Sequence, residues 1–236
     1  MYHTDLNSFE SDIRRAILSR RFFAGLLAEL VILMVSGMNS EAFCISVPIL
    51  CTLPYTTVVL EDLQSGFIKS YLPRTNRKAY IYGKAYSCML SGGLVLMLSV
   101  FLFAKWKQSG IEGKIYLFFG GSRFDMNYPG EGKEVAAYYG LLFLSGALWA
   151  LVSTTLSVWT KSRYIAYGSS FVIYYLLVIL QQRYAAAFYM MNPMEWFQYQ
   201  HIWVFGQWGI GLMLAGIMLI VLFLYVQIVE RRIAQG

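Results

Sequence analysis

Six long apolar segments dominate the sequence and restrict the folds that it can adopt. A helix needs about 20 residues to cross the hydrocarbon core of a bilayer. It also satisfies its backbone hydrogen bonds within its own segment, which lipid requires. We expect one all-α membrane domain over residues 1–236 with six transmembrane helices, at residues 22–36, 42–60, 85–104, 135–160, 165–180 and 208–228. The first and fifth segments are short and are expected to borrow flanking residues.

The composition favours a membrane protein over a soluble domain. Of the 236 residues, 58% are hydrophobic and only 14% are charged, whereas soluble proteins carry about a quarter charged residues. The excess of 19 Lys and Arg over 13 Asp and Glu could suggest nucleic acid. These cations lie beside apolar segments, however, and this placement indicates a lipid bilayer and no nucleic-acid partner.

The distribution of the cations predicts the orientation. The loops and ends on the N-terminal side of the bilayer hold 13 Lys and Arg, and those on the other side hold six. Cytoplasmic loops are enriched in these residues. The sequence therefore predicts a multi-pass protein of the cytoplasmic (inner) membrane, with both termini and residues 61–84 in the cytoplasm.

The polar interruption at residues 61–84 carries seven charged residues between two apolar segments. Its apolar residues share one helical face, and they are Leu63, Phe67, Ile68 and Tyr71. Gly66 lies in the middle of this pattern, and Pro73 disfavours helical geometry at the preceding residue. The pattern predicts a short amphipathic helix over residues 61–72, with Gly66 allowing another backbone to come close. A solvated loop is the alternative, although a loop has no use for the apolar face.

This stretch resembles the corresponding part of the permease subunits of type-2 ABC transporters, the small six-helix exporter kind. Between their second and third membrane helices these permeases carry an acidic residue, a glycine, a short amphipathic helix, a proline or basic segment and a glycine-lysine pair. The residues that match this order are Glu61, Gly66, Pro73, Arg74, Arg77, Gly83 and Lys84. The predicted topology of the whole chain agrees with the family.

The resemblance implies that residues 61–72 are a coupling helix, which rests in a groove of a separate ATPase subunit. It implies a translocation path formed by two permease copies, identical or related, working with two ATPase copies. ATP and Mg would bind the ATPase, and this chain would hold no cofactor. The residues implied in coupling are Glu61, Leu63, Gly66, Phe67, Ile68, Tyr71, Pro73, Arg74, Arg77 and Lys84.

The sequence contains no catalytic motif of its own. A Walker A loop has a glycine five residues before its Gly-Lys pair and a Ser or Thr after it. The three Gly-Lys pairs end at Lys84, Lys114 and Lys133, and none of them meets either condition. We therefore expect a pore subunit with no catalytic residues, whose ATP is hydrolysed on a partner.

The N-terminal residues 5–21 form a second amphipathic pattern. Leu6, Phe9, Ile13 and Ile17 recur at helical spacing, and cations occupy other faces. This pattern is typical of a helix that lies in the cytoplasmic membrane interface. A disordered basic leader is the alternative.

Three residues inside the first two apolar segments are candidates for a translocation path. Glu29 lies well inside the first segment, where a charge at the bilayer centre costs about 2.5–3.5 kcal/mol. Pro48 and Pro54 each remove a backbone hydrogen bond from the second segment. They predict a bent helix that faces protein or water. For Glu29, a carboxylate that reaches back to the cytoplasmic boundary is an equal alternative.

Two further patterns lie later in the chain. Small residues form two clusters that predict close helix packing within the subunit. One is at Ser87, Ser91, Gly92 and Gly93, and the other is at Gly209, Gly211, Ala215 and Gly216. The segment at residues 181–207 is too polar for a span and fits an outer or re-entrant element. Its soft side chains are too few to predict a copper site, and they are Met190, Met191, Met194 and His201. No metal site is expected.

Two functions stay open at this point. The first is the permease of an ATP-driven exporter. The second is a non-transporting membrane scaffold or sensor-associated subunit that holds a cytoplasmic partner through the same helix. Nothing in the apolar segments selects among peptides, lipids, drugs and polysaccharides as a substrate.

Overall fold

The computed structural model describes residues 2–38, 40–66, 68, 76–108, 133–184, 188–196 and 206–235. This part of the chain is helical and contains no strand. Its α-helices are α1 (Tyr2–Ile17), α2 (Arg20–Ser36), α3 (Glu41–Leu50), α4 (Val58–Gln64), α6 (Arg77–Gln108), α8 (Lys133–Thr160), α9 (Arg163–Tyr184) and α10 (Gly206–Gln235). Two short 3-10 helices, η2 (Tyr189–Met191) and η3 (Pro193–Trp196), lie between α9 and α10.

Four of the described helices are long and apolar enough to cross a membrane, which indicates a multi-pass membrane protein. The four spans are Arg77–Lys107, Val135–Thr160, Arg163–Tyr184 and Gly206–Ala234. They contain the last four segments that the sequence predicts as spans. A helix is also present at the predicted N-terminal position as α1, but it ends at Ile17 and not at residue 21, because Ser19 caps the start of α2. Its position in a membrane interface stays a prediction.

The first two predicted spans are not among these four. α2, from Arg20 to Ser36, contains the first predicted span with two flanking residues, and its 17 residues are at the lower limit of length for a span. The second predicted span, at residues 42–60, is expected as a bent helix, and in the structure the bend is a full break, because α3 ends at Leu50 and α4 begins at Val58. Pro54 has no amide hydrogen to give the Leu50 carbonyl. The amide of Leu53 donates to that carbonyl instead, at 3.3 Å, in a tighter turn. Pro48 is accommodated inside α3.

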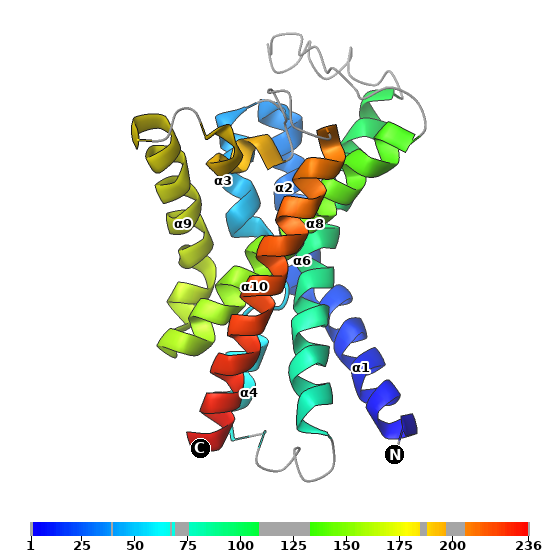
Figure 1. The fold of residues 1–236 in the computed structure, drawn as a ribbon. Coiled ribbons are helices and arrows are strands. Elements are labelled where there is room, and N and C mark those ends of the chain that lie inside the picture. The colour runs from blue at the N-terminus through cyan, green and yellow to red at the C-terminus, as the bar shows by residue number, and fades with distance from the viewer. Residues whose placement is uncertain are drawn as a thin grey trace.

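The helices run between two opposite ends of the molecule (Figure 1). The start of α1 and the last turns of α10 lie at one of these, which we call the terminal end. α4 lies toward the same end. The end of α6, the start of α8, and the short helices η2 and η3 lie at the opposite end, which we call the far end.

α6 and α8 cross at the centre of the molecule with their backbones in contact. A Cβ atom on Gly146 of α8 would lie 2.6 Å from the Gly92 carbonyl oxygen of α6. A Cβ atom on Gly93 would lie 2.6 Å from the Phe143 ring. The prediction of close packing within the subunit is therefore confirmed at Gly92 and Gly93, where any side chain would separate the helices. It is wrong at Gly216 of α10, because nothing lies within 4 Å of its Cβ position.

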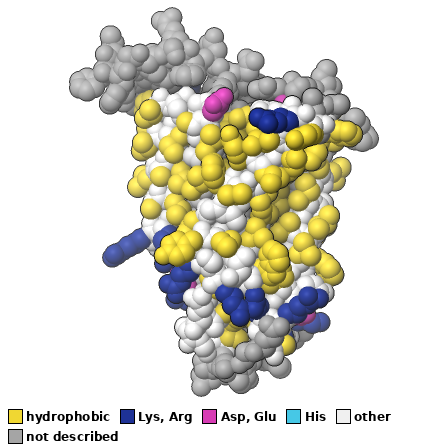
Figure 2. All heavy atoms as spheres, turned by 90° about the vertical axis from the view of Figure 1, so that its left-hand side faces the viewer, with side chains coloured by type: hydrophobic (Ala, Val, Ile, Leu, Met, Phe, Trp, Pro, Cys, Tyr) yellow, Lys and Arg dark blue, Asp and Glu magenta, His cyan; other side chains and the backbone are white. Residues whose placement is uncertain are grey.

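The outer helices present apolar surface. Only 17% of the apolar stretch of α9 and of α10 is buried, against 67% for α6 and 78% for α8. Figure 2, which views the α9 side, shows hydrophobic side chains over most of the height and Lys and Arg gathered toward the terminal end. An apolar band bordered by cations is the surface expected of a protein that lies in a bilayer.

The glycine contact between α6 and α8 predicts a stability difference between two similar variants. Gly146→Ala overfills the crossing, and overpacking costs about 1–3 kcal/mol. It is expected to lower the melting temperature of the purified protein in detergent. Gly140→Ala is a matched control on the same helix, since nothing lies within 4 Å of its Cβ position. Alanine favours a helix over glycine by about 1 kcal/mol, so this variant should melt at or above the wild-type temperature. Equal melting of the two variants would contradict the tight crossing.

Candidate functional site

α4 is held at the terminal end by polar contacts with several other elements. Arg21, at the start of α2, donates to the Thr57 hydroxyl at 2.9 Å and lies 3.5 Å from the Glu61 carboxylate. The Gln64 side chain donates to the Lys161 carbonyl at 3.3 Å and accepts from Arg163 at 3.4 Å. The helix is therefore bridged to α2 on one side and to the turn between α8 and α9 on the other.

A buried charge cluster lies where α1, α4 and α6 meet. The ammonium of Lys84 on α6 is 2.8 Å from Asp12 of α1 and 3.1 Å from Asp62 of α4. The Lys84 side chain is 3% exposed, and the two carboxylates are 15% and 12% exposed. We call Asp12, Asp62, Lys84 and the two tyrosines described next the Lys84 cluster.

Two tyrosines complete the cluster. The Tyr55 hydroxyl donates to Asp12 at 2.9 Å and accepts from Lys84 at 3.1 Å. The Tyr80 hydroxyl donates to Asp62 at 2.9 Å. The Lys84 ammonium also lies 5.5 Å from the centre of each tyrosine ring, which is within the range of cation–π attraction. Each buried charge thus has both a counter-charge and hydrogen bonds, as burial requires.

These contacts change the role expected for Lys84. The sequence places Lys84 among the residues that contact an ATPase, yet its buried ammonium faces the inside of its own chain. Arg77 is half-buried, and its guanidinium donates to the Glu230 carbonyl of α10. Both cations therefore tie elements of this chain together, because a buried cation must find its partners locally.

The predicted coupling helix also differs from the structure. The helix runs over Val58–Gln64, so Gly66 is not inside it but in the turn that follows, with φ +71°. Glycine suits this position because a side chain is strained at such an angle. Leu63 and Ile68 pack against Val59, Ile81 and other core residues. Ile68 is therefore buried within its own chain, and Leu63 is partly covered, although the sequence assigns both to the groove of a partner.

The exposed residues at the C-terminal end of α4 are Gln64 and, in the turn that follows, Ser65 and Gly66; we call these three residues the tip of α4. Glu61 is half-exposed and accepts from the Thr57 hydroxyl at 3.0 Å. Four residues of the predicted coupling set, Phe67, Tyr71, Pro73 and Arg74, lie outside the described residues.

The three candidates for a translocation path lie between helices of the same chain. Glu29 is fully buried, and one of its carboxylate oxygens accepts from Ser46 of α3 at 3.1 Å. The other has no hydrogen-bond partner. The Pro48 carbonyl accepts from the Ser170 hydroxyl of α9 at 2.6 Å, and Pro54 is buried in the turn before α4. The alternative in which Glu29 reaches back to solvent does not agree with this burial, and a role on a path stays a prediction.

Sequence reasoning missed four of the five members of the Lys84 cluster. Asp12, Tyr55, Asp62 and Tyr80 come from four separate parts of the chain, and no local pattern joins them. One signal was present: a lysine at the start of an apolar helix, one turn after a tyrosine, needs a counter-charge from elsewhere.

The described residues contain no group of three or more His, Cys, Asp or Glu side chains that could hold a metal ion. Comparison of the chain with protein-family models, with curated proteins and with solved structures finds no match. The ABC permease interpretation of residues 61–84 therefore stays a hypothesis from the sequence, and the structure adds the geometry around α4 to it.

The Lys84 cluster predicts a strong and coupled effect on stability. Lys84→Met leaves Asp12 and Asp62 buried without their cation, and removing one partner of a buried ion pair costs about 3–5 kcal/mol. The melting temperature of the purified protein should fall clearly. Lys78→Met, an exposed lysine earlier on the same helix, should have little effect.

A double variant tests the pairing itself. Adding Asp62→Asn to Lys84→Met removes one of the two unpaired charges, so the double variant should melt higher than Lys84→Met alone. The effects of two substitutions on the free energy of unfolding add up when the residues are independent, and they do not add up when the residues interact. Strictly additive losses would contradict the cluster.

Proposed function

We propose that this chain is the membrane-spanning permease subunit of an ATP-driven exporter of the ABC type. It forms a translocation path with a second permease copy and is driven by two copies of a separate ATPase subunit that bind ATP and Mg. The observation that carries the proposal is the bracing of α4 by α2, α6 and the turn between α8 and α9, with α1 joined to it through Lys84. A short helix held in this way can pass a force applied at its tip to α6 through the buried Lys84 cluster.

The residues available to an ATPase are fewer than the sequence indicates. Gln64, Ser65 and Gly66 form an exposed tip that a partner can reach, and Phe67 is the aromatic anchor that the sequence predicts next to it in the chain. Glu61 lies one turn before the tip and connects α4 to α2 through its ion pair with Arg21. Lys84 contributes by fixing the helix to α6, and not by touching the partner.

The second permease copy has apolar surface available to it. α2 exposes Phe23, Leu27, Val31 and Val35, and α9 exposes Val172, Tyr175, Leu176 and Ile179. These faces suit contact with lipid or with helices of another copy. In the proposed complex, part of this surface meets the second copy and the rest meets the bilayer.

The proposed orientation places the terminal end in the cytoplasm and the far end outside. It is supported by the exposed cations Arg15, Arg20, Arg21, Lys161, Arg163 and Arg231 near the terminal end, since cytoplasmic boundaries are enriched in Lys and Arg.

Thiol labelling tests this orientation. The native Cys44, Cys51 and Cys88 are buried, so an introduced exposed cysteine should dominate the signal. Tyr184→Cys, where the side chain is 81% exposed, should react with an impermeant reagent added to intact cells. Asn76→Cys, exposed near the opposite end, should react only in inside-out vesicles. Labelling of residue 76 from outside would overturn the orientation and the coupling role of α4 together.

Co-purification tests the function. The tagged chain, purified from its own host, is expected to bring down an ATPase subunit that lacks membrane segments. Ser65→Arg adds bulk and charge at the exposed tip and should reduce the retained ATPase by about tenfold, the ratio given by a loss of about 1.4 kcal/mol. Phe67→Ala should act in the same direction, because truncating an aromatic anchor commonly costs about 2 kcal/mol or more.

The matched control is Gln182→Arg, which makes a similar change at an exposed position of the far end and should leave the retained ATPase unchanged. Absence of any ATPase with the wild-type chain would contradict the proposal. A kinase or regulator in its place would favour the alternative, a membrane scaffold that holds a cytoplasmic partner.

A further inference from the structure

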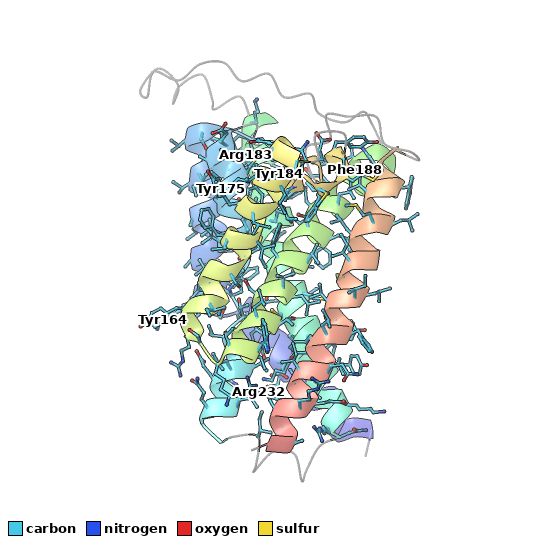
Figure 3. All side chains as sticks on the ribbon, turned by 60° about the vertical axis from the view of Figure 1, so that its left-hand side comes forward. Tyr164, Tyr175, Arg183, Tyr184, Phe188 and Arg232 are labelled. Atoms are coloured by element: carbon cyan, nitrogen blue, oxygen red, sulfur yellow. The ribbon has the colours of Figure 1, made fainter. Side chains whose placement is uncertain are left out.

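A basic cavity opens at the terminal end between the last turns of α8 and α10. It has a volume of about 220 Å³ and is lined by Trp159, Ile228, Arg231 and Arg232. Figure 3 shows Arg232 beside α10 near the terminal end. Neither the coupling role of α4 nor the Lys84 cluster involves this cavity.

The two arginines of the cavity differ in their surroundings. The Arg232 guanidinium donates to the carbonyl of Trp159, at the end of α8, so it is held in place at the cavity wall. Arg231 is exposed. A planar guanidinium donates several hydrogen bonds in a fixed geometry that matches phosphate oxygens. The lining is therefore suited to an anionic phosphate group.

An apolar stripe runs along α10 into the same cavity. Ile220, Leu224 and Ile228 recur every four residues and so share one helical face. Ile220 is 63% exposed and Leu224 is 48% exposed, while Ile228 lines the cavity. The stripe lies within the membrane-spanning stretch of α10. A partner from the aqueous phase does not reach this surface, whereas a lipid chain does.

Trp159 places the cavity at the level of lipid headgroups. Its side chain is 61% exposed at the end of the apolar helix α8, and tryptophan in such a position is typical of the membrane–water interface. Cationic pockets between membrane helices at the cytoplasmic side bind anionic headgroups.

We infer that this cavity, with the stripe above it, is a binding site for one anionic phospholipid. The phosphate lies against Arg231 and Arg232, the glycerol region beside Trp159 and Ile228, and an acyl chain along Leu224 and Ile220. The inference requires only that the chain spans a bilayer with its terminal end at one surface, and it does not depend on the ATPase.

Native mass spectrometry of the purified chain in detergent tests the site. Phosphatidylglycerol and phosphatidylcholine with identical acyl chains are added separately at equal concentrations. The wild-type chain should retain phosphatidylglycerol in preference to phosphatidylcholine. Arg231→Ala should weaken phosphatidylglycerol retention by about fivefold, which corresponds to the roughly 1 kcal/mol that each such cation contributes near an anionic membrane surface. Arg231→Lys should keep most of the retention.

Three controls distinguish a lipid site at this cavity from general attraction between a basic protein and an anion. Arg183→Ala removes an exposed arginine at the far end and should leave retention unchanged. Leu224→Asn should weaken retention of both lipids, because it interrupts the stripe. Glycerol phosphate, which has no acyl chain, should not displace the lipid at equal concentration.

Two results would overturn the inference. One is equal retention of the two lipids by the wild-type chain. The other is an Arg231→Ala variant that keeps phosphatidylglycerol at the wild-type level. If that variant instead lost a co-purifying protein subunit, the cavity would be a protein contact.

Discussion

The ammonium of Lys84, held between Asp12 and Asp62, is the interaction on which the terminal end of the molecule depends. A charge at 3% exposure is tolerated only with its counter-charges in place. Those counter-charges belong to α1 and α4, while Lys84 belongs to α6. The requirement to pair one charge therefore fixes three helices relative to each other. Tyr55 and Tyr80 narrow the arrangement further, since each must direct its hydroxyl to one particular carboxylate.

The rest of the bundle is built on a different principle. α6 and α8 meet through glycines, so their backbones are as close as helices can come and have little freedom to slide. α9 and α10 bury only a small part of their apolar stretches and leave the rest open to lipid or to another chain. The central pair, joined to the Lys84 cluster, is therefore the most constrained part of the molecule. The apolar stripe of α10 belongs to the surface that the outer helices leave open.

The sequence predicted the last four spans because each is a long, uninterrupted apolar run. Such a run crosses a bilayer as a helix, which satisfies all of its backbone hydrogen bonds. At residues 42–60 the two prolines predicted a bent helix, whereas the structure has two helices with a turn between them. The prediction at Gly66 was wrong, because the periodic pattern places this residue inside a helix and the backbone places it in a turn. The Lys84 cluster could not be predicted from the sequence for a different reason. Asp12 and Lys84 are 72 positions apart, and periodicity reports which face a residue occupies, not which distant residue meets it.

The bracing of α4 has a mechanical consequence for the proposed transporter. A load at Ser65 and Gly66 reaches α6 through Asp62 and Lys84, and it reaches the start of α9 through Gln64 and Arg163. The buried ion pair between Asp62 and Lys84 resists separation, because breaking it would leave a buried charge without its counter-charge. The exposed contact between Gln64 and Arg163 is weak, since surface polar contacts contribute at most about 1 kcal/mol. α4 and α6 should therefore move as one body, while α9 follows only loosely. In a dimer that meets through α2 and α9, this difference in stiffness would let α6 turn within each copy without first breaking the contact between copies.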